Sequence, residues 1–221
     1  MNRRSTLLAA LTLTAAAALT LSACGGDRDS EDKGSDKGKS AGADAGDAKS
    51  ASPTASAADV AGRPDITLPS DLKLIFETKK TGDAVKDAVL ADNAERMRAV
   101  DAAITGTDPD GEALAYYNTG KAREAALTWV KQFKDANASL TGEARYYDRR
   151  VTLKSGTTAL LSFCADESKG FSKDKKTGKA DKTPVTKNSY VHYNTRLDKN
   201  SAGTWQTSQI ISTRGAAQCQ P

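Results

Sequence analysis

Residues 143–164 read EARYYDRRVTLKSGTTALLSFC, two alternating segments on either side of a Ser-Gly turn. In the first segment, residues 143–154, apolar and polar side chains alternate. One face is expected to carry Tyr147, Val151 and Leu153, and the other Tyr146, Asp148 and Arg150. The second segment, residues 157–164, is rich in Leu and Phe. Alternation with a period of two around a short turn predicts a β-hairpin.

Two more strands are expected after this hairpin. Residues 189–198 and 204–213 are both rich in aromatic and β-branched side chains, and the polar segment 199–203 separates them. Consecutive antiparallel strands form a meander more readily than a crossover. The sequence therefore predicts a four-stranded antiparallel meander. A further strand candidate, residues 72–77, stands apart from it.

Helical patterns fill the segment before the hairpin. Residues 83–105 carry apolar side chains at helical spacing, and Gly106 suits the position after a helix end. Asp108-Pro109 is typical of a helix start, and this short helix is expected to end near Gly120. A third helix is expected from Lys121. Its apolar face, predicted to lie in the core, is Ala122, Ala126, Trp129, Val130 and Phe133. Helices followed by a meander indicate an α+β domain.

The N-terminus carries an export signal. Two arginines precede an uncharged run of Leu, Ala and Thr over residues 7–21, which is too short to span a bilayer. Leu21-Ser22-Ala23-Cys24 resembles the lipobox of bacterial lipoprotein precursors. That resemblance implies a signal peptide over 1–23, cleavage before Cys24 and a diacylglycerol on its sulfur. The alternative is an ordinary signal peptide in which Cys24 is incidental.

Residues 24–63 are expected to form a lipidated, disordered tether. After Cys24 they are mainly Gly, Ser, Ala, Asp and Lys, and such a stretch buries too little apolar surface to fold. Residues 64–221 then form a single domain of ordinary size. Its 24 basic and 20 acidic side chains balance too closely to indicate a nucleic-acid partner. The expected location is the outer face of the cytoplasmic membrane.

The element order resembles the nuclear-transport-factor-two-like superfamily. The whole chain resembles uncharacterised lipoproteins of high-GC Gram-positive (actinobacterial) type that carry such a domain. The residues behind this resemblance are Tyr116-Tyr117, the Ala/Trp face of the third helix, Gly142, Phe163-Cys164-Ala165-Asp166, Gly203-Thr204-Trp205 and Cys219. The resemblance implies helices packed into the concave side of a curved, cone-like sheet. The strand candidate at 72–77 departs from it.

With Cys24 assigned to lipid, two cysteines remain, Cys164 and Cys219. Export favours oxidation, so a structural disulfide between them is expected. The alternative is a reactive thiol or redox pair, which normally requires closer spacing such as C-x-x-C.

Candidates for acid–base catalysis are few. His192 is the only histidine, which excludes a zinc site built from several histidines; no metal or cofactor is expected. Some enzymes of the cone-shaped superfamily use a pocket His with an Asp, for which Asp148 and Asp166 are the candidates here. The alternative is a surface histidine. Asp166-Glu167 at a strand end could also serve in acid–base work or simply form a polar turn.

A lysine-rich segment, residues 169–187, is expected to be a long exposed connection between strands. The candidates to contact an anionic surface, such as headgroups or a cell-envelope polymer, are Lys173, Lys175, Lys176, Lys179 and Lys182. The alternative is a solvated hairpin extension.

Two functions are therefore considered. The first is a membrane-anchored extracytoplasmic lipoprotein that acts as a non-enzymatic binding or accessory module, with the bilayer and an envelope polymer or protein as partners. The second is a cone-shaped enzyme with a pocket His/Asp pair. A two-lobed transporter-binding lipoprotein would need a longer chain.

Overall fold

The structure is a computed structural model that describes residues 62–221. The predicted signal peptide, Cys24 and all but the last two residues of the predicted tether lie outside the described residues. Those predictions stay predictions. Within the described part, no helix has both the length and the apolar character that a bilayer-spanning segment needs.

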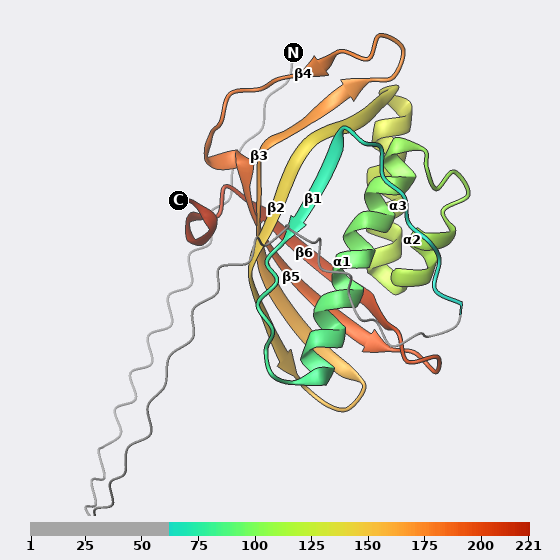
Figure 1. Cartoon of the computed structure of the whole chain (residues 1–221), viewed down its shortest axis with the longest axis vertical. Coiled ribbons are helices and arrows are strands. Elements are labelled where there is room, and N and C mark those ends of the chain that lie inside the picture. Colours follow the sequence, from blue (N-terminus) through green and yellow to red (C-terminus); the bar gives the residue numbers. More distant parts are fainter. Residues whose placement is uncertain (1–61) are drawn as a thin grey trace, which may run out of the picture. The chain divides into compact units, whose positions relative to one another are not determined.

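A curved sheet forms one layer of the domain (Figure 1). Its strand order is β1 (Leu72–Phe76), β2 (Ala138–Leu153), β3 (Thr158–Asp174), β5 (Tyr190–Lys199) and β6 (Trp205–Arg214), and β4 (Ala180–Asp181) pairs with the end of β3. The antiparallel pairs β2–β3, β3–β5 and β5–β6 confirm the predicted meander. The predicted count of four strands was wrong, because β1 adds parallel to β2 and β4 adds to β3.

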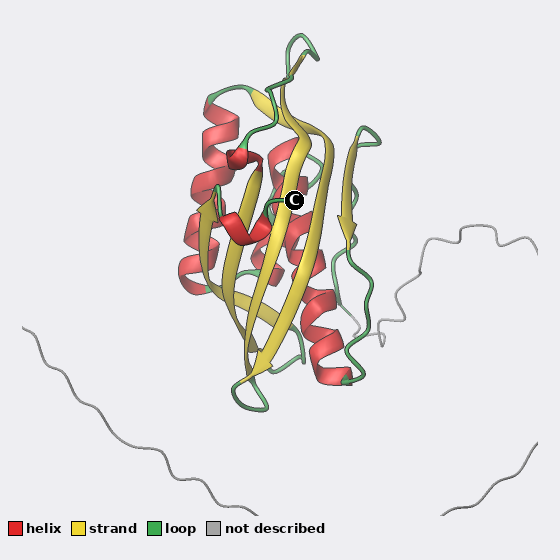
Figure 2. Cartoon of the chain, turned by 90° about the vertical axis from the view of Figure 1, so that its left-hand side faces the viewer, coloured by secondary structure: helices red, strands yellow, loops and turns green. Residues whose placement is uncertain are grey.

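Three helices cover one face of this sheet (Figure 2). They are α1 (Ala84–Thr105), α2 (Glu112–Tyr117) and α3 (Gly120–Asp135). The ends of α1 confirm the sequence pattern: the Asp83 carboxylate accepts the amides of Val85 and Lys86, and Gly106 follows the last turn at φ 93°. The expected start of α2 was wrong. The chain turns once more after Asp108, whose carboxylate accepts the amide of Glu112 at 3.0 Å.

Two register shifts interrupt the β2–β3 pair and help to curve the sheet: the first has its extra residue in β3, between Lys169 and Asp166, and the second has it in β2. Just before the first shift, which lies between Glu143 and Arg145, Gly142 has φ +94°, and a Cβ there would lie 2.1 Å from the carbonyl oxygen of Lys169, so only glycine fits. At the second, Asp148 has φ 49° beside a register shift between Tyr147 and Arg150. This extra residue reverses the predicted faces. Tyr146, and not Tyr147, packs in the core that Val151 and Leu153 contact.

Strand β3 is much longer than predicted. It was expected to end at Cys164 but continues to Asp174, because it pairs with residues 138–143 of β2, most of which precede the expected strand start. Lys169 and Lys173 therefore lie in a strand. The long exposed connection expected from residue 169 begins only after Asp174.

The core has two main parts. Between α1 and the sheet, side chains such as Val89, Phe163, Leu197 and Trp205 are buried almost completely. Between the helices, the buried residues are Val100, Ala103, Ile104, Leu114, Ala126 and Val130. Each fully buried large apolar side chain contributes about 1.5–3 kcal/mol. These contacts hold the helices against the sheet.

Candidate functional site

A cavity of about 560 Å³ lies between the helices and the facing side of the sheet. Its lining side chains come from α1 and α3 on one side and from β1, β2, β3, β5 and β6 on the other. This volume falls in the range of about 300–1,000 Å³ that small-molecule sites occupy. We call it the central cavity.

Aromatic side chains from both the helix side and the sheet side line the central cavity. We call Trp129, Phe133 and Phe171 the aromatic wall. The rings of Trp129 and Phe133 meet edge to face at 5.1 Å between centroids. Trp129 was predicted to lie in the core, and this was wrong: it is 45% exposed. The helix α3 presents Ala122, Ala126 and Val130 to its neighbours, and Trp129 lies beside this stripe at the cavity.

Arg96 is a buried cation in the cavity lining. It is 5% exposed. Its Nε donates to Asn118 Oδ1 at 2.8 Å, and its Nη1 contacts Met97 Sδ at 3.2 Å. No ion pair joins Arg96 to any carboxylate between residues 62 and 221, and Nη2 donates to none of these residues.

Asp101 lies about one turn further along α1 and also lines the cavity. Burial raises the pKa of its carboxyl to about 7; the negative charge of Glu167 adds to the rise and the positive charge of Arg96 opposes it. Within the described chain, the Asp101 carboxyl forms no hydrogen bond. A pKa of about 7 allows this carboxyl to gain or lose a proton near neutral pH.

Two phenols face the same space. Tyr146 from β2 and Tyr193 from β5 line the cavity, and burial raises the pKa of each hydroxyl above its usual value. Both stay protonated at neutral pH. Neither hydroxyl is hydrogen-bonded to a residue of the described domain, so both are free to bind a ligand.

Glu167 and Arg214 are two further charged residues in the lining of the cavity. Their side chains form an ion pair at 2.8 Å. Glu167 was considered together with Asp166 as a pair of carboxylates. Strand alternation separates them, because Glu167 lines the cavity whereas Asp166 does not.

This arrangement suits the binding of a small organic molecule. An apolar cavity with a few convergent polar groups is the usual form of such sites. A carboxyl with a pKa near 7 can also act as a general acid or base. Among residues 62–221, no group of three or more His, Cys, Asp or Glu side chains is placed to hold a metal ion.

The predicted His/Asp candidates are not brought together in this cavity. His192, Asp148 and Asp166 are absent from its lining. His192 pairs in register with Cys164, and both lie on the sheet face opposite to Val191 and Tyr193. The side-chain contact of His192 is with Asn194, 3.3 Å from its Nδ1.

The predicted disulfide is present. Cys164 and Cys219 are bonded, with 5.4 Å between their Cα atoms. The short C-terminal helix Ala217–Cys219 therefore lies against the face of the sheet opposite to α1 (Figure 1). The Tyr147 hydroxyl donates to the Cys219 carbonyl there.

Two of the five candidate lysines bind the domain itself. Lys173 pairs with Asp71 at 2.6 Å, and Lys175 Nζ donates to the Ile104 carbonyl at 3.1 Å. Lys176, Lys179 and Lys182 are exposed. Contact of these three with an anionic surface stays a prediction.

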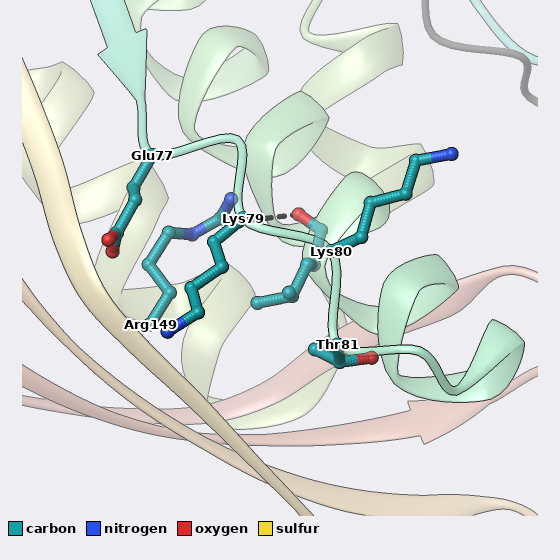
Figure 3. Close-up of a pocket in the computed structure, with 6 residues that line it drawn as sticks. Glu77, Lys79, Lys80, Thr81 and Arg149 are labelled. Atoms are coloured by element: carbon teal, nitrogen blue, oxygen red, sulfur yellow. Dashed lines mark hydrogen bonds between the residues drawn. The ribbon is translucent and has the colours of Figure 1, made fainter. Parts of the chain in front are cut away.

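A second, smaller cavity of about 260 Å³ lies beside the loop that follows β1 (Figure 3). Its lining includes Arg149, whose Nη2 donates to the Leu90 carbonyl at 2.5 Å and to Asn93 Oδ1 at 3.3 Å. The guanidinium also stacks over the Phe76 ring at 5.2 Å. Arg149 thus ties the Asp148 bulge of β2 to α1. The Lys80 side chain extends away from it (Figure 3).

The sequence patterns did not identify Arg96 or Asp101. A signal was present: these charged residues flank Met97 and Val100 on the apolar stripe of the predicted helix. Charge inside such a stripe must be buried or must face a cavity.

Neither a protein-family model nor a curated protein sequence matches the chain. Several solved structures are similar to part of this chain at low sequence identity. These neighbours are NTF2-like and ketosteroid isomerase-like proteins. A ketosteroid isomerase-like protein from Erwinia carotovora atroseptica has 15% identity and a TM-score of 0.41, over 60% of this chain and 97% of its own.

Two further solved structures are similar to part of the chain. An NTF2-like protein of unknown function in nutrient uptake from Rhodospirillum rubrum has 14% identity and a TM-score of 0.39, over 57% of this chain and 97% of its own. The hexachlorocyclohexane dehydrochlorinase LinA-type3 from Novosphingobium barchaimii has 11% identity and a TM-score of 0.40, over 60% and 90%. Similarity at this level assigns no activity to the present chain.

Proposed function

We propose that this chain is an extracytoplasmic lipoprotein, held at the outer face of the cytoplasmic membrane through a diacylglycerol on Cys24. Support comes from the basic start, the apolar run and the lipobox-like Leu21-Ser22-Ala23-Cys24. Two acyl chains on one residue suffice for stable anchoring. The polar segment after Cys24 then acts as a tether for the domain.

We further propose that the domain is a non-enzymatic module that binds an apolar small molecule in the central cavity. The observation that carries this proposal is the aromatic wall: a tryptophan left 45% exposed at a cavity of about 560 Å³. Large apolar side chains at the border of a cavity are typical of ligand sites.

Binding of a neutral apolar probe tests this proposal. N-phenyl-1-naphthylamine is expected to bind and to fluoresce, and Trp129→Ala is expected to weaken its affinity by about 5- to 30-fold, because one large aromatic contact is lost. Leu127→Ala is the matched control. Leu127 is 49% exposed on the same helix but does not line the cavity. If both variants bind the probe with equal affinity, the probe does not bind at the aromatic wall.

Intact mass tests the anchor. Protein extracted from membranes of an actinobacterial host is expected to begin at Cys24 and to carry the mass of acyl groups. Cys24→Ser is expected to lose the acyl mass and to leave the membrane fraction. An unmodified cysteine at position 24 in the mature wild-type chain would contradict the proposal.

One observation favours a second candidate, an enzyme that uses Asp101 as acid or base. Its carboxyl has a pKa of about 7 and lies in a cavity with two free phenols, which suits proton transfer at neutral pH. The bound compound distinguishes the two functions. Recovery of the ligand unchanged from deuterated water supports binding alone. Exchange of a carbon-bound proton that Asp101→Asn abolishes supports the enzyme.

A further inference from the structure

Among residues 62–221, Arg96 has no charged partner. A buried guanidinium normally pairs with a carboxylate, because leaving it alone in an apolar surrounding is costly. Arg96 instead donates to a neutral amide, Asn118, and contacts the sulfur of Met97. Arg96 also lines the central cavity, and its Nη2 donates to no residue of the described part of the chain.

The two carboxyls that line the same cavity do not neutralise Arg96. Glu167 is already paired with Arg214. Asp101 lies outside ion-pair distance of Arg96, and its burial favours the neutral form. When Asp101 is protonated, the cavity therefore holds one uncompensated positive charge, next to the aromatic wall.

We propose that the ligand is an organic anion, whose acidic group binds Arg96 and whose apolar body lies along the aromatic wall. This inference rests on the proposed binding function and narrows it to one ligand class. Arginine is suited to this role, because its planar fork binds planar or tetrahedral oxyanions through paired hydrogen bonds. The hydroxyls of Tyr146 and Tyr193 supply further donors in the same cavity.

A matched pair of probes tests the charge preference. 8-Anilinonaphthalene-1-sulfonate and N-phenyl-1-naphthylamine share one ring system and differ by the sulfonate. The wild-type full chain is expected to bind the sulfonate at least about 10-fold more tightly, since a hydrogen bond to a charged group is worth a factor of about ten or more. Equal or weaker binding of the sulfonate overturns the inference.

The Arg96→Gln variant tests whether Arg96 is the residue that causes the preference for the sulfonate probe. It is expected to lower affinity for the sulfonate by about 10- to 100-fold and to leave the neutral probe within about 3-fold. Arg123→Gln, at an exposed arginine of α3 outside the cavity, is the control and should change neither. A sulfonate preference that survives in Arg96→Gln overturns the inference.

Arg96→Lys, which retains the charge, provides a second test if the Gln variant does not fold. It is expected to keep a weakened preference for the sulfonate. Complete loss of the preference in a folded Arg96→Lys variant would show that charge at this position is not what recognises the anion.

The pH dependence provides an independent readout. The charged groups around Asp101 are Arg96 on its own helix, Glu167 on β3 and Arg214 on β6, and the phenols Tyr146 and Tyr193 face the same cavity. Of these, Asp101 is expected to change charge near pH 7. Deprotonation places a negative charge beside the anion, so sulfonate affinity should fall as the pH rises through about 7.

Asp101→Asn is expected to remove this fall while keeping tight binding at high pH. The affinity of the neutral probe should not change as the pH rises through about 7. Failure of both probes to bind overturns the proposed function itself. Binding of the neutral probe without a preference for the sulfonate overturns the anion inference alone, so the two failures are distinguishable.

Discussion

Asp92→Ala is expected to lower the free energy of unfolding by about 3–5 kcal/mol, the usual cost of breaking a buried ion pair from one side. Asp92 is 1% exposed in the middle of α1. One carboxylate oxygen pairs with Arg63, and the other accepts the backbone amide of Trp205 at 2.7 Å. Alanine leaves both donors without this acceptor.

Urea unfolding followed by tryptophan fluorescence measures the effect. Asp110→Ala is the matched control, because Asp110 is exposed and should change stability by no more than about 0.5 kcal/mol. Asp92→Asn keeps an acceptor for the Trp205 amide and loses only the charge, so it should cost less than Asp92→Ala. A loss below about 1 kcal/mol for Asp92→Ala would show that the carboxylate does not join α1 to β6.

Removal of the disulfide is expected to have a comparable effect. The double variant Cys164→Ala, Cys219→Ala opens a loop of 55 residues, for which the chain-entropy relation gives a loss of about 4 kcal/mol. The double variant should also free the C-terminal helix, because Cys219 and Ala216 pack in a small cluster with Cys164.

The wild-type chain with and without reductant gives the same comparison without mutation. Reductant should lower the urea midpoint of the wild-type chain to near that of the double variant, and should leave the double variant unchanged. An unfolding curve of the wild-type chain that does not respond to reductant under denaturing conditions would contradict a stabilising bridge.

Local patterns predicted those elements in which the tertiary surroundings agree with the local preference. Asp83 and Gly106 mark the ends of α1 because capping needs only the helix itself. The Ser155-Gly156 turn and the alternation around it likewise predicted the β2–β3 hairpin. In these places no distant contact had to be known.

The reversed faces of β2 show where such patterns fail. Strict alternation of side chains assigned Tyr146 to the polar face. The extra residue at the Asp148 bulge reverses that alternation, so Tyr146 packs in the core. The predicted length of β3 was wrong for a related reason. Its second half is polar, and it is a strand only because residues 138–143 of β2 lie beside it.

The candidate site was only partly predictable. Trp129 and Glu167 were identified but were given other roles, and Arg96 and Asp101 were missed. A charged residue on a helix normally faces water. Here six separate segments close around Arg96 and Asp101. The position of these charges beside the apolar stripe of α1 indicates burial, but nothing local to α1 identifies the segments that surround them.

The Arg63–Asp92 pair also has a mechanical consequence. Residue 63 is where the described chain first attaches to the interior of the domain, and Asp92 connects it to the start of β6. Ile66, three residues on, packs against Ala99, Ala113 and Tyr117. A pull on the N-terminal side of the domain thus reaches the middle of α1 and the Trp205 backbone before it reaches the edge strand β1. Tension on a tether would therefore load the centre of the fold first and would spare the hydrogen bonds at the sheet edge.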